Sequence, residues 1–236
     1  MNVLAFDTCL GAVSAAVRWR GPEGCRLHEV IELRSAGHAE RLMPMIAEVM
    51  AATGASFAGL DRIAVTQGPG GFTSVRVGVA AARALALATG KPVVAATSLA
   101  VMAHRVEEML AETGAPLMTR RLLVAVDARR GALFVQGFAA GAVAMSEAQL
   151  LTPREAAGGL GGEGAIVVGS GASAVAAAAQ EVGTIAEARF PDLQPAARNL
   201  ALMAERLAPA SPVKPLYLRL PDARPQEGTA LARTEA

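Results

Sequence analysis

The residues best suited to chemistry lie in a glycine-rich segment between an apolar strand pattern and a long helical pattern. The segment reads Gln67-Gly68-Pro69-Gly70-Gly71-Phe72-Thr73-Ser74-Val75-Arg76. A turn of this kind before a helix start is where α/β proteins commonly bind phosphate groups, because free backbone N–H groups point outward there. It has neither the Gly-Lys-Ser/Thr ending of a P-loop nor the glycine spacing of a dinucleotide site. Its proline and glycines predict a loop of defined shape, with a task other than standard nucleotide binding.

Two aspartates occupy matching places in the chain. Asp7 and Asp127 each end an apolar strand pattern, and a glycine follows each of them four positions later. Facing each other across a cleft, two such carboxylates would hold the magnesium ion of a bound nucleotide, and the hydroxyl of Thr8 would face its phosphates. Alternatively, each aspartate caps its own turn by accepting a backbone N–H bond, and the Thr8 hydroxyl satisfies local backbone groups. For Asp7 both interpretations stay open, whereas for Asp127 the turn cap is favoured.

Histidine and cysteine add little to this chemistry. The histidines His28, His38 and His104 lack the i, i+4 spacing of a zinc-binding helix, so no metal centre and no metallopeptidase is predicted. His38 stands at a predicted helix start, where a solvated side chain is favoured and contact with a partner or a substrate is the alternative. Cys9 has no histidine near it in the sequence, so we expect a small packing residue, and no pair of residues suits a catalytic nucleophile and its base.

The elements that must position these residues begin with three predicted strands and continue with alternating helices and strands. The predicted strands are 1–8, 12–19, 26–33, 62–66 and 92–96, and the predicted helices are 39–52, 73–89 and 98–111. Hairpin-linked strands followed by alternating helices and strands predict a mixed sheet that is parallel in its second half, with helices on its faces. This is the layout of a ribonuclease-H-like lobe.

The opening of the chain is repeated near its middle. Residues 3–7 with Gly11 match residues 123–127 with Gly131, and we interpret the match as an internal duplication. The second copy continues with a helix at 152–157, a strand at 165–168 and helices at 173–181 and 196–207. We therefore expect an α/β protein with two ribonuclease-H-like lobes of the actin-like ATPase (ASKHA) superfamily. The predicted division is 1–111, a degenerate lobe at 112–215, and a C-terminal strand and disordered tail at 216–236.

The two helices at 39–52 and 73–89 carry more apolar or small side chains than packing on one sheet requires. The surplus methionines are Met43, Met45 and Met50, and the small side chains are Ala80, Ala81, Ala84 and Ala88. Methionines adapt to irregular partners and alanines allow another helix to approach closely, so these residues suit a protein interface. Burial of the helix at 39–52 between the two lobes is the alternative.

Composition limits the function further. The chain has 236 residues, of which 53% are hydrophobic and 3% aromatic, and a net charge of +1. This content supports a sizeable core, but it gives no basic field or stacking platform for RNA, so any RNA substrate is held by another chain. Apolar runs end before the roughly 20 residues that a membrane span needs, which predicts a cytoplasmic protein without a membrane segment.

Several of these segments together resemble one family. They are 3–8 with the following hairpin, His38-Ala39-Glu40 with Leu42-Met43-Pro44, the segment 68–78, Thr97-Ser98-Leu99, 126–131 and Tyr217-Leu218-Arg219. The pattern is similar to that of the TsaB (YeaZ) family and spans nearly the whole chain, with the central glycine-rich loop as its most specific part.

The resemblance implies a non-catalytic scaffold that activates formation of threonylcarbamoyladenosine beside the tRNA anticodon. In that family the catalytic partner is TsaD, the ATPase TsaE joins them, and a homodimer forms when the partner is absent. The N-lobe helices make these contacts, which places Met43, Met50 and Ala81 or Ala84 at the interface. Arg76 and Arg83 then contribute to the interface or to ATP or ADP shared between subunits.

A different function for the same fold stays open from the sequence. In a small ATPase or sugar kinase of the actin-like class, Asp7 and Asp127 would hold magnesium and turnover would depend on both.

Overall fold

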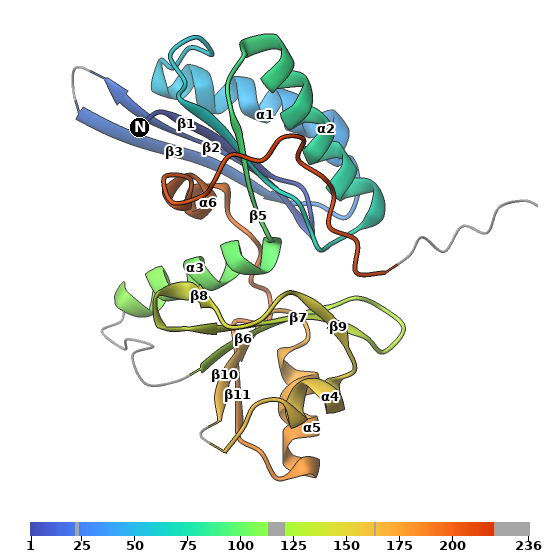
Figure 1. The fold of residues 1–236 in the computed structure, drawn as a ribbon. Coiled ribbons are helices and arrows are strands. Elements are labelled where there is room, and N and C mark those ends of the chain that lie inside the picture. The colour runs from blue at the N-terminus through green and yellow to red at the C-terminus, as the bar shows by residue number, and fades with distance from the viewer. Residues whose placement is uncertain (22–23, 113–120, 163, 220–236) are drawn as a thin grey trace, which may run out of the picture.

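Two β-sheets, one above the other in Figure 1, form the two lobes of the protein. The computed structural model describes residues 1–21, 24–112, 121–162 and 164–219. The first lobe contains β1 (Val3–Asp7), β2 (Ala12–Gly21), β3 (Gly24–Leu33), α1 (His38–Thr53), β4 (Arg62–Thr66), α2 (Phe72–Thr89) and β5 (Val93–Ala96).

The first sheet has the strand order β3-β2-β1-β4-β5. Its first three strands are antiparallel hairpin neighbours, whereas β4 and β5 run parallel to β1. All five residues of β1 are buried, because helices cover both faces of this central strand, and its sequence is accordingly almost continuously apolar. The predicted ribonuclease-H-like layout of this lobe is confirmed.

The second lobe repeats this plan. Its elements are α3 (Ser98–Glu112), β6 (Arg121–Asp127), β7 (Leu133–Ala139), η1 (Ala140–Ala142), β8 (Val143–Ala144), β9 (Gln149–Leu151), α4 (Pro153–Gly158), β10 (Ala165–Val168), α5 (Ala172–Val182) and β11 (Ala186–Arg189), followed by α6 (Ala197–Met203). The strand order is β11-β10-β6-β7-β8, and β9 also pairs with β7. β6 runs antiparallel to β7 and parallel to β10, as β1 does with β2 and β4. The predicted repeat is confirmed, and the chain has the predicted α/β fold with two mixed sheets flanked by helices.

Helices cover each sheet on both faces. α1 and α2 pack on one face of the first sheet, and α6 packs on the other with Val101 of α3. The remaining buried face of α3 contacts the second sheet, whose far side is covered by α4 and α5. α3 and α6 therefore lie between the two sheets, as Figure 1 shows.

The C-terminal part of the described chain returns to the first lobe. The amide of Ala210 donates to the Val93 carbonyl at 2.8 Å, and the amide of Leu216 donates to the Gln67 carbonyl at 2.6 Å. Arg219 then reaches the second lobe, where its Nη1 donates to the Ala128 carbonyl at 2.7 Å. The end of the described chain thus connects the two lobes.

Some predicted elements differ from those observed. The helix predicted at 196–207 is shorter in the structure, where α6 spans Ala197–Met203. Residues 216–219 form no strand, which corrects the predicted C-terminal strand over these residues, and residues 220–236 lie outside the described residues. The division into 1–111 and 112–215 stays a prediction, and α6 packs across it on the first sheet. β11 was missed because its sequence, Ala-Glu-Ala-Arg, contains none of the β-branched or aromatic residues that mark strands.

One helix, α2, is long and apolar enough to cross a membrane by length and composition alone, with 22% of its residues buried. A single helix of this kind is weak support for a membrane span. In the structure it packs on β4 and α1, and Arg83 within it donates from Nε to the Val213 carbonyl at 2.8 Å.

Candidate functional site

A cleft of about 880 Å³ lies between the two lobes. The starts of α1 and α2, the turn after β1, the turn after β6 and the loop before α6 form its walls. The lining residues are 9–11, 34–40, 70–71, 73–74, Val77, 126–129, Phe134, Ser170 and 193–194. This set includes Arg34 and Arg129 as well as Glu40 and Asp127, so the cleft contains charges of both signs.

Asp7 does not line the cleft. Its side chain is fully buried, with Oδ1 accepting hydrogen bonds from the Thr66 hydroxyl and from the Cys9 amide at 3.3 Å. Oδ2 is buried and has no hydrogen-bond partner among the described residues. Burial raises the pKa of this carboxyl from 3.8 to about 6, although the bonds from Thr66 and Cys9 oppose the rise. The interpretation of Asp7 as a turn cap therefore fits the structure.

Asp127 is exposed in the cleft and also caps its turn. Its Oδ1 accepts a hydrogen bond from the Arg129 amide at 2.8 Å, and its own amide donates to Ser170 Oγ at 2.9 Å. Because Asp127 lines the cleft and Asp7 does not, the structure fails to bring the two predicted magnesium ligands together. In the part of the chain that the structure describes, no three His, Cys, Asp or Glu side chains are placed to hold a metal ion. The predicted pair of magnesium ligands, Asp7 and Asp127, is therefore not assembled between the lobes.

The glycine-rich loop packs against neighbouring backbone. A Cβ atom on Gly70 would lie 2.1 Å from the Cys9 carbonyl oxygen, and one on Gly68 would lie 2.7 Å from the Leu216 carbonyl oxygen. The Gly71 amide donates to the same Cys9 carbonyl at 2.9 Å. Close backbone approach thus explains these glycines, as the sequence predicted for a loop of defined shape.

Two of the predicted cofactor-binding residues are engaged elsewhere. Thr8 is buried, and its hydroxyl donates to the Ser74 carbonyl at 2.6 Å, which anchors the start of α2. Arg76 is exposed but does not line the cleft; its Nε donates to the Tyr217 hydroxyl at 2.7 Å, and its guanidinium lies 3.8 Å from the centre of the Phe72 ring. Neither side chain points at the cleft, which corrects the role assigned to Thr8.

The predicted interface residues do not all share one surface. Met43 exposes 48% of its surface on α1 and Ala84 is exposed on α2, while Ala81 is half-buried beside the core. Met50 exposes only 6% and belongs to the core of the first lobe, so it is removed from the candidate interface. The most exposed large apolar side chain on these two helices is Leu87 of α2, at 90%, which the sequence reasoning missed.

The remaining predicted residues have structural partners. His38 lines the cleft with Nε2 at 3.1 Å from the Leu10 carbonyl oxygen. Cys9 is buried with Sγ at 3.2 Å from the Thr66 hydroxyl, and burial together with the nearby Asp7 raises the pKa of its thiol, which fits a packing residue. Gln194, whose Oε1 accepts from the Gly11 amide at 2.9 Å across the cleft, carried no recognisable signal in the sequence.

Comparisons with known proteins agree with this architecture. A family model described as TsaD, tRNA N6-adenosine threonylcarbamoyltransferase, matches residues 30–159, more than half of the chain. The tRNA threonylcarbamoyladenosine biosynthesis protein TsaB of Haemophilus influenzae is 32% identical over 134 residues, which are 57% of this chain and 52% of that protein. The chain thus spans about half the length of such curated relatives.

Two full-length similarities complete the comparison. An uncharacterized protein of Mycobacterium tuberculosis is 30% identical over 224 residues, covering 95% of this chain and 94% of that protein. The solved structure of YeaZ from Pseudomonas aeruginosa superposes with a TM-score of 0.74 at 26% identity, covering 92% of this chain and 99% of that chain. Together with the family model, these similarities show that the chain belongs to the TsaB (YeaZ) family of TsaD-related proteins.

Proposed function

We propose that this chain is an accessory subunit for threonylcarbamoyladenosine formation on tRNA, and that it acts by binding a TsaD-type catalytic partner. Family membership supports the pathway, because relatives are named for it. The exposed apolar face on α1 and α2 supports the mode of action, and it is the observation that carries the proposal.

α1 and α2 contact each other, and three of their apolar side chains are exposed outside the core of the lobe: Met43 on α1, and Ala84 and Leu87 on α2. A side chain as exposed as Leu87 gains little from the folded monomer, whereas burial against a partner would stabilise a complex by about 1.5–3 kcal/mol. Small neighbours such as Ala84 leave room for a helix of the partner to lie close.

Within this proposal the catalytic chemistry belongs to the partner. TsaE joins the complex as a separate ATPase, a homodimer uses the same helix face when the partner is absent, and tRNA is bound through the partner in the cytoplasm. Binding of ATP or ADP in the interlobe cleft remains a prediction. The alternative of a small ATPase or sugar kinase loses its main support, because Asp7 is withdrawn from that cleft.

The experiment is a binding assay between this chain and the TsaD-type protein of the same genome, by analytical ultracentrifugation. Leu87→Asp places a charge on the proposed face. Ile185→Asp is the matched control, since Ile185 is also an exposed apolar residue, at 66%, but lies on the second lobe beside β11.

We expect wild type and Ile185→Asp to form the complex with similar affinity, and Leu87→Asp to bind at least about 100-fold more weakly, because an interface charge is left desolvated without a partner. Equal binding by all three proteins would refute the assigned face. Failure of wild type to bind, with magnesium-dependent ATP hydrolysis by the isolated chain, would refute the accessory role.

A further inference from the structure

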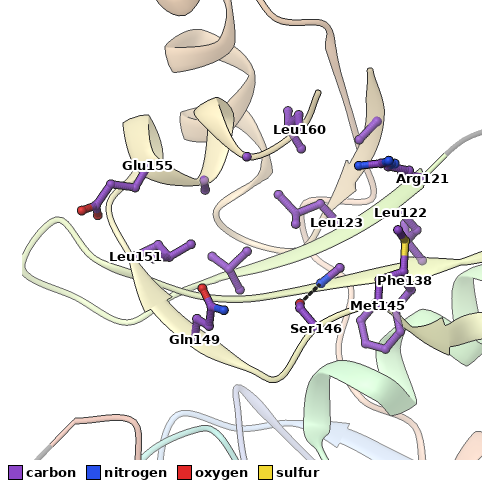
Figure 2. A pocket seen from close by; sticks show the side chains of 15 residues that line it. Arg121, Leu122, Leu123, Phe138, Met145, Ser146, Gln149, Leu151, Glu155 and Leu160 are labelled. Carbon is purple, nitrogen blue, oxygen red and sulfur yellow. Dashed lines mark hydrogen bonds between the residues drawn. The ribbon is translucent and has the colours of Figure 1, made fainter. Parts of the chain in front are cut away.

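A second cavity, of about 290 Å³, lies wholly within the second lobe and away from the interlobe cleft. Its floor is the face of the sheet formed by β6, β7 and β9, and α4 with the loop behind it forms its roof. Figure 2 shows Leu123, Leu151 and Leu160 around its interior, with Arg121 and Glu155 on opposite sides. The size is near the lower limit of small-molecule sites, enough for a ligand of roughly ten heavy atoms.

Small residues keep this cavity open. Gly137 occupies a position on β7 two residues after Val135, so both face the cavity. A Cβ atom on Gly137 would meet only Ser146 Oγ, at 3.7 Å, which means that the sheet has room there for a side chain it does not carry. Ala156 and Ala165 line the cavity from the opposite side. Larger residues at these positions would close the core, as packing normally does.

The charged side chains at the two sides of the cavity would orient a bound anion. Arg121 is exposed, and its guanidinium has no hydrogen-bond or ion-pair partner among the described residues. Glu155 on the opposite side is already engaged, because its Oε2 accepts from the Thr152 amide and hydroxyl, each at 2.8 Å. An anion is therefore attracted toward Arg121 and repelled from Glu155, while the interior between them is apolar.

We propose that this cavity is a binding site for a small organic carboxylate, with its apolar body against Leu123, Leu151 and Leu160 and its carboxylate on Arg121. A guanidinium suits a carboxylate because its parallel N–H groups match the two oxygens. The site is independent of the partner-binding face of α1 and α2, so either proposal can fail without the other.

The test uses hydrocinnamate, a phenyl ring joined to a carboxylate by two methylene groups, and its neutral amide as the comparison ligand. Binding is followed by amide shifts in two-dimensional NMR spectra of the full chain. Hydrocinnamate should shift the amides of Gly137 and Leu160, and should bind to Arg121→Gln about tenfold more weakly than to wild type. The neutral amide should bind wild type and Arg121→Gln equally.

Two controls separate the site from general effects. Arg154→Gln changes an exposed arginine of the same lobe that does not line the cavity, and should leave binding unchanged. Gly137→Leu should abolish binding of both ligands, whereas Gly162→Leu, placed in open space, should not. If Gly137→Leu does not fold, Gly137→Ala should still weaken binding several-fold. The proposal is overturned if hydrocinnamate shifts neither amide up to about 10 mM, or if Arg121→Gln binds it as wild type does.

Discussion

Replacing Asp7 by Asn should remove a pH dependence of stability that the wild-type protein carries. Burial at the end of β1 raises the pKa of the Asp7 carboxyl from 3.8 to about 6. Because the folded protein then holds this proton more tightly than the unfolded chain, the resulting stabilisation is complete below the unfolded pKa. It is lost as the pH rises through the folded pKa of about 6.

The magnitude follows from the same two values. The difference between 3.8 and about 6, at about 1.4 kcal/mol for each pKa unit, gives about 3 kcal/mol in the free energy of unfolding. About 2 kcal/mol of this is lost between about pH 4.5 and about pH 7.5. The Asn side chain does not titrate, so its buried amide adds an offset that is the same at every pH.

The assay is urea unfolding at several pH values, followed by the fluorescence of Trp19, which lies against Gly59 in the same lobe as Asp7. The difference between wild type and Asp7→Asn cancels every other titrating group. We expect the unfolding free energy of wild type to fall relative to the variant by about 2 kcal/mol over that range. A difference that stays constant within about 0.5 kcal/mol, or that changes in the opposite direction, would refute the reasoning.

Two further substitutions test the local packing. Gly70→Ala should destabilise the first lobe by more than about 3 kcal/mol, because the new Cβ would lie 2.1 Å from the Cys9 carbonyl oxygen. Its control is Gly90→Ala, at a left-handed position with open space around it, which should destabilise the protein by only about 1 kcal/mol; thermal unfolding measures both. Thr152→Ala removes the capping box that Thr152 and Glu155 form at the start of α4, and urea unfolding should show a loss of about 1 kcal/mol, whereas Thr152→Ser should retain most of the stability.

Local patterns were sufficient to predict much of the fold. The apolar runs ending at Asp7 and Asp127, each with a glycine four residues later, predicted the repeated hairpins, because strand and turn preferences act over a few residues. β11 and the short strands β8 and β9 gave no such signal. They form by pairing with exposed edges of β10 and β7, so their structure depends on strands elsewhere in the sheet and not on their own sequences.

The candidate interface shows that helical periodicity alone could not predict which side chains of α1 are exposed. Met43 and Met50 are seven residues apart and lie on the same side of α1, so periodicity treats them alike. Met50 belongs to the core of the first lobe together with Leu60 from the segment after the helix, whereas Met43 is exposed. The packing around the helix therefore decides which methionine remains exposed, and the helix pattern does not contain it.

The failed pairing of the two aspartates has a physical cause within the duplication itself. In each lobe, a glycine in the loop before a helix donates a hydrogen bond to backbone in or just after the first parallel strand. Before α2, the Gly71 amide donates to the Cys9 carbonyl at 2.9 Å, just after β1. Before α5, the Gly171 amide donates to the Ala125 carbonyl of β6 at 3.0 Å.

The loop of the first lobe, residues 67–71, is longer than its counterpart at 169–171. Gly70 and Gly71 of this loop pack on the Cys9 carbonyl just beyond β1, where Asp7 is buried, whereas Asp127 at the end of β6 is exposed to the cleft. Two positions that are equivalent in sequence and topology therefore differ in solvation. The two aspartates that the sequence pattern predicts as a pair of magnesium ligands therefore do not meet in the cleft, because only Asp127 lines it.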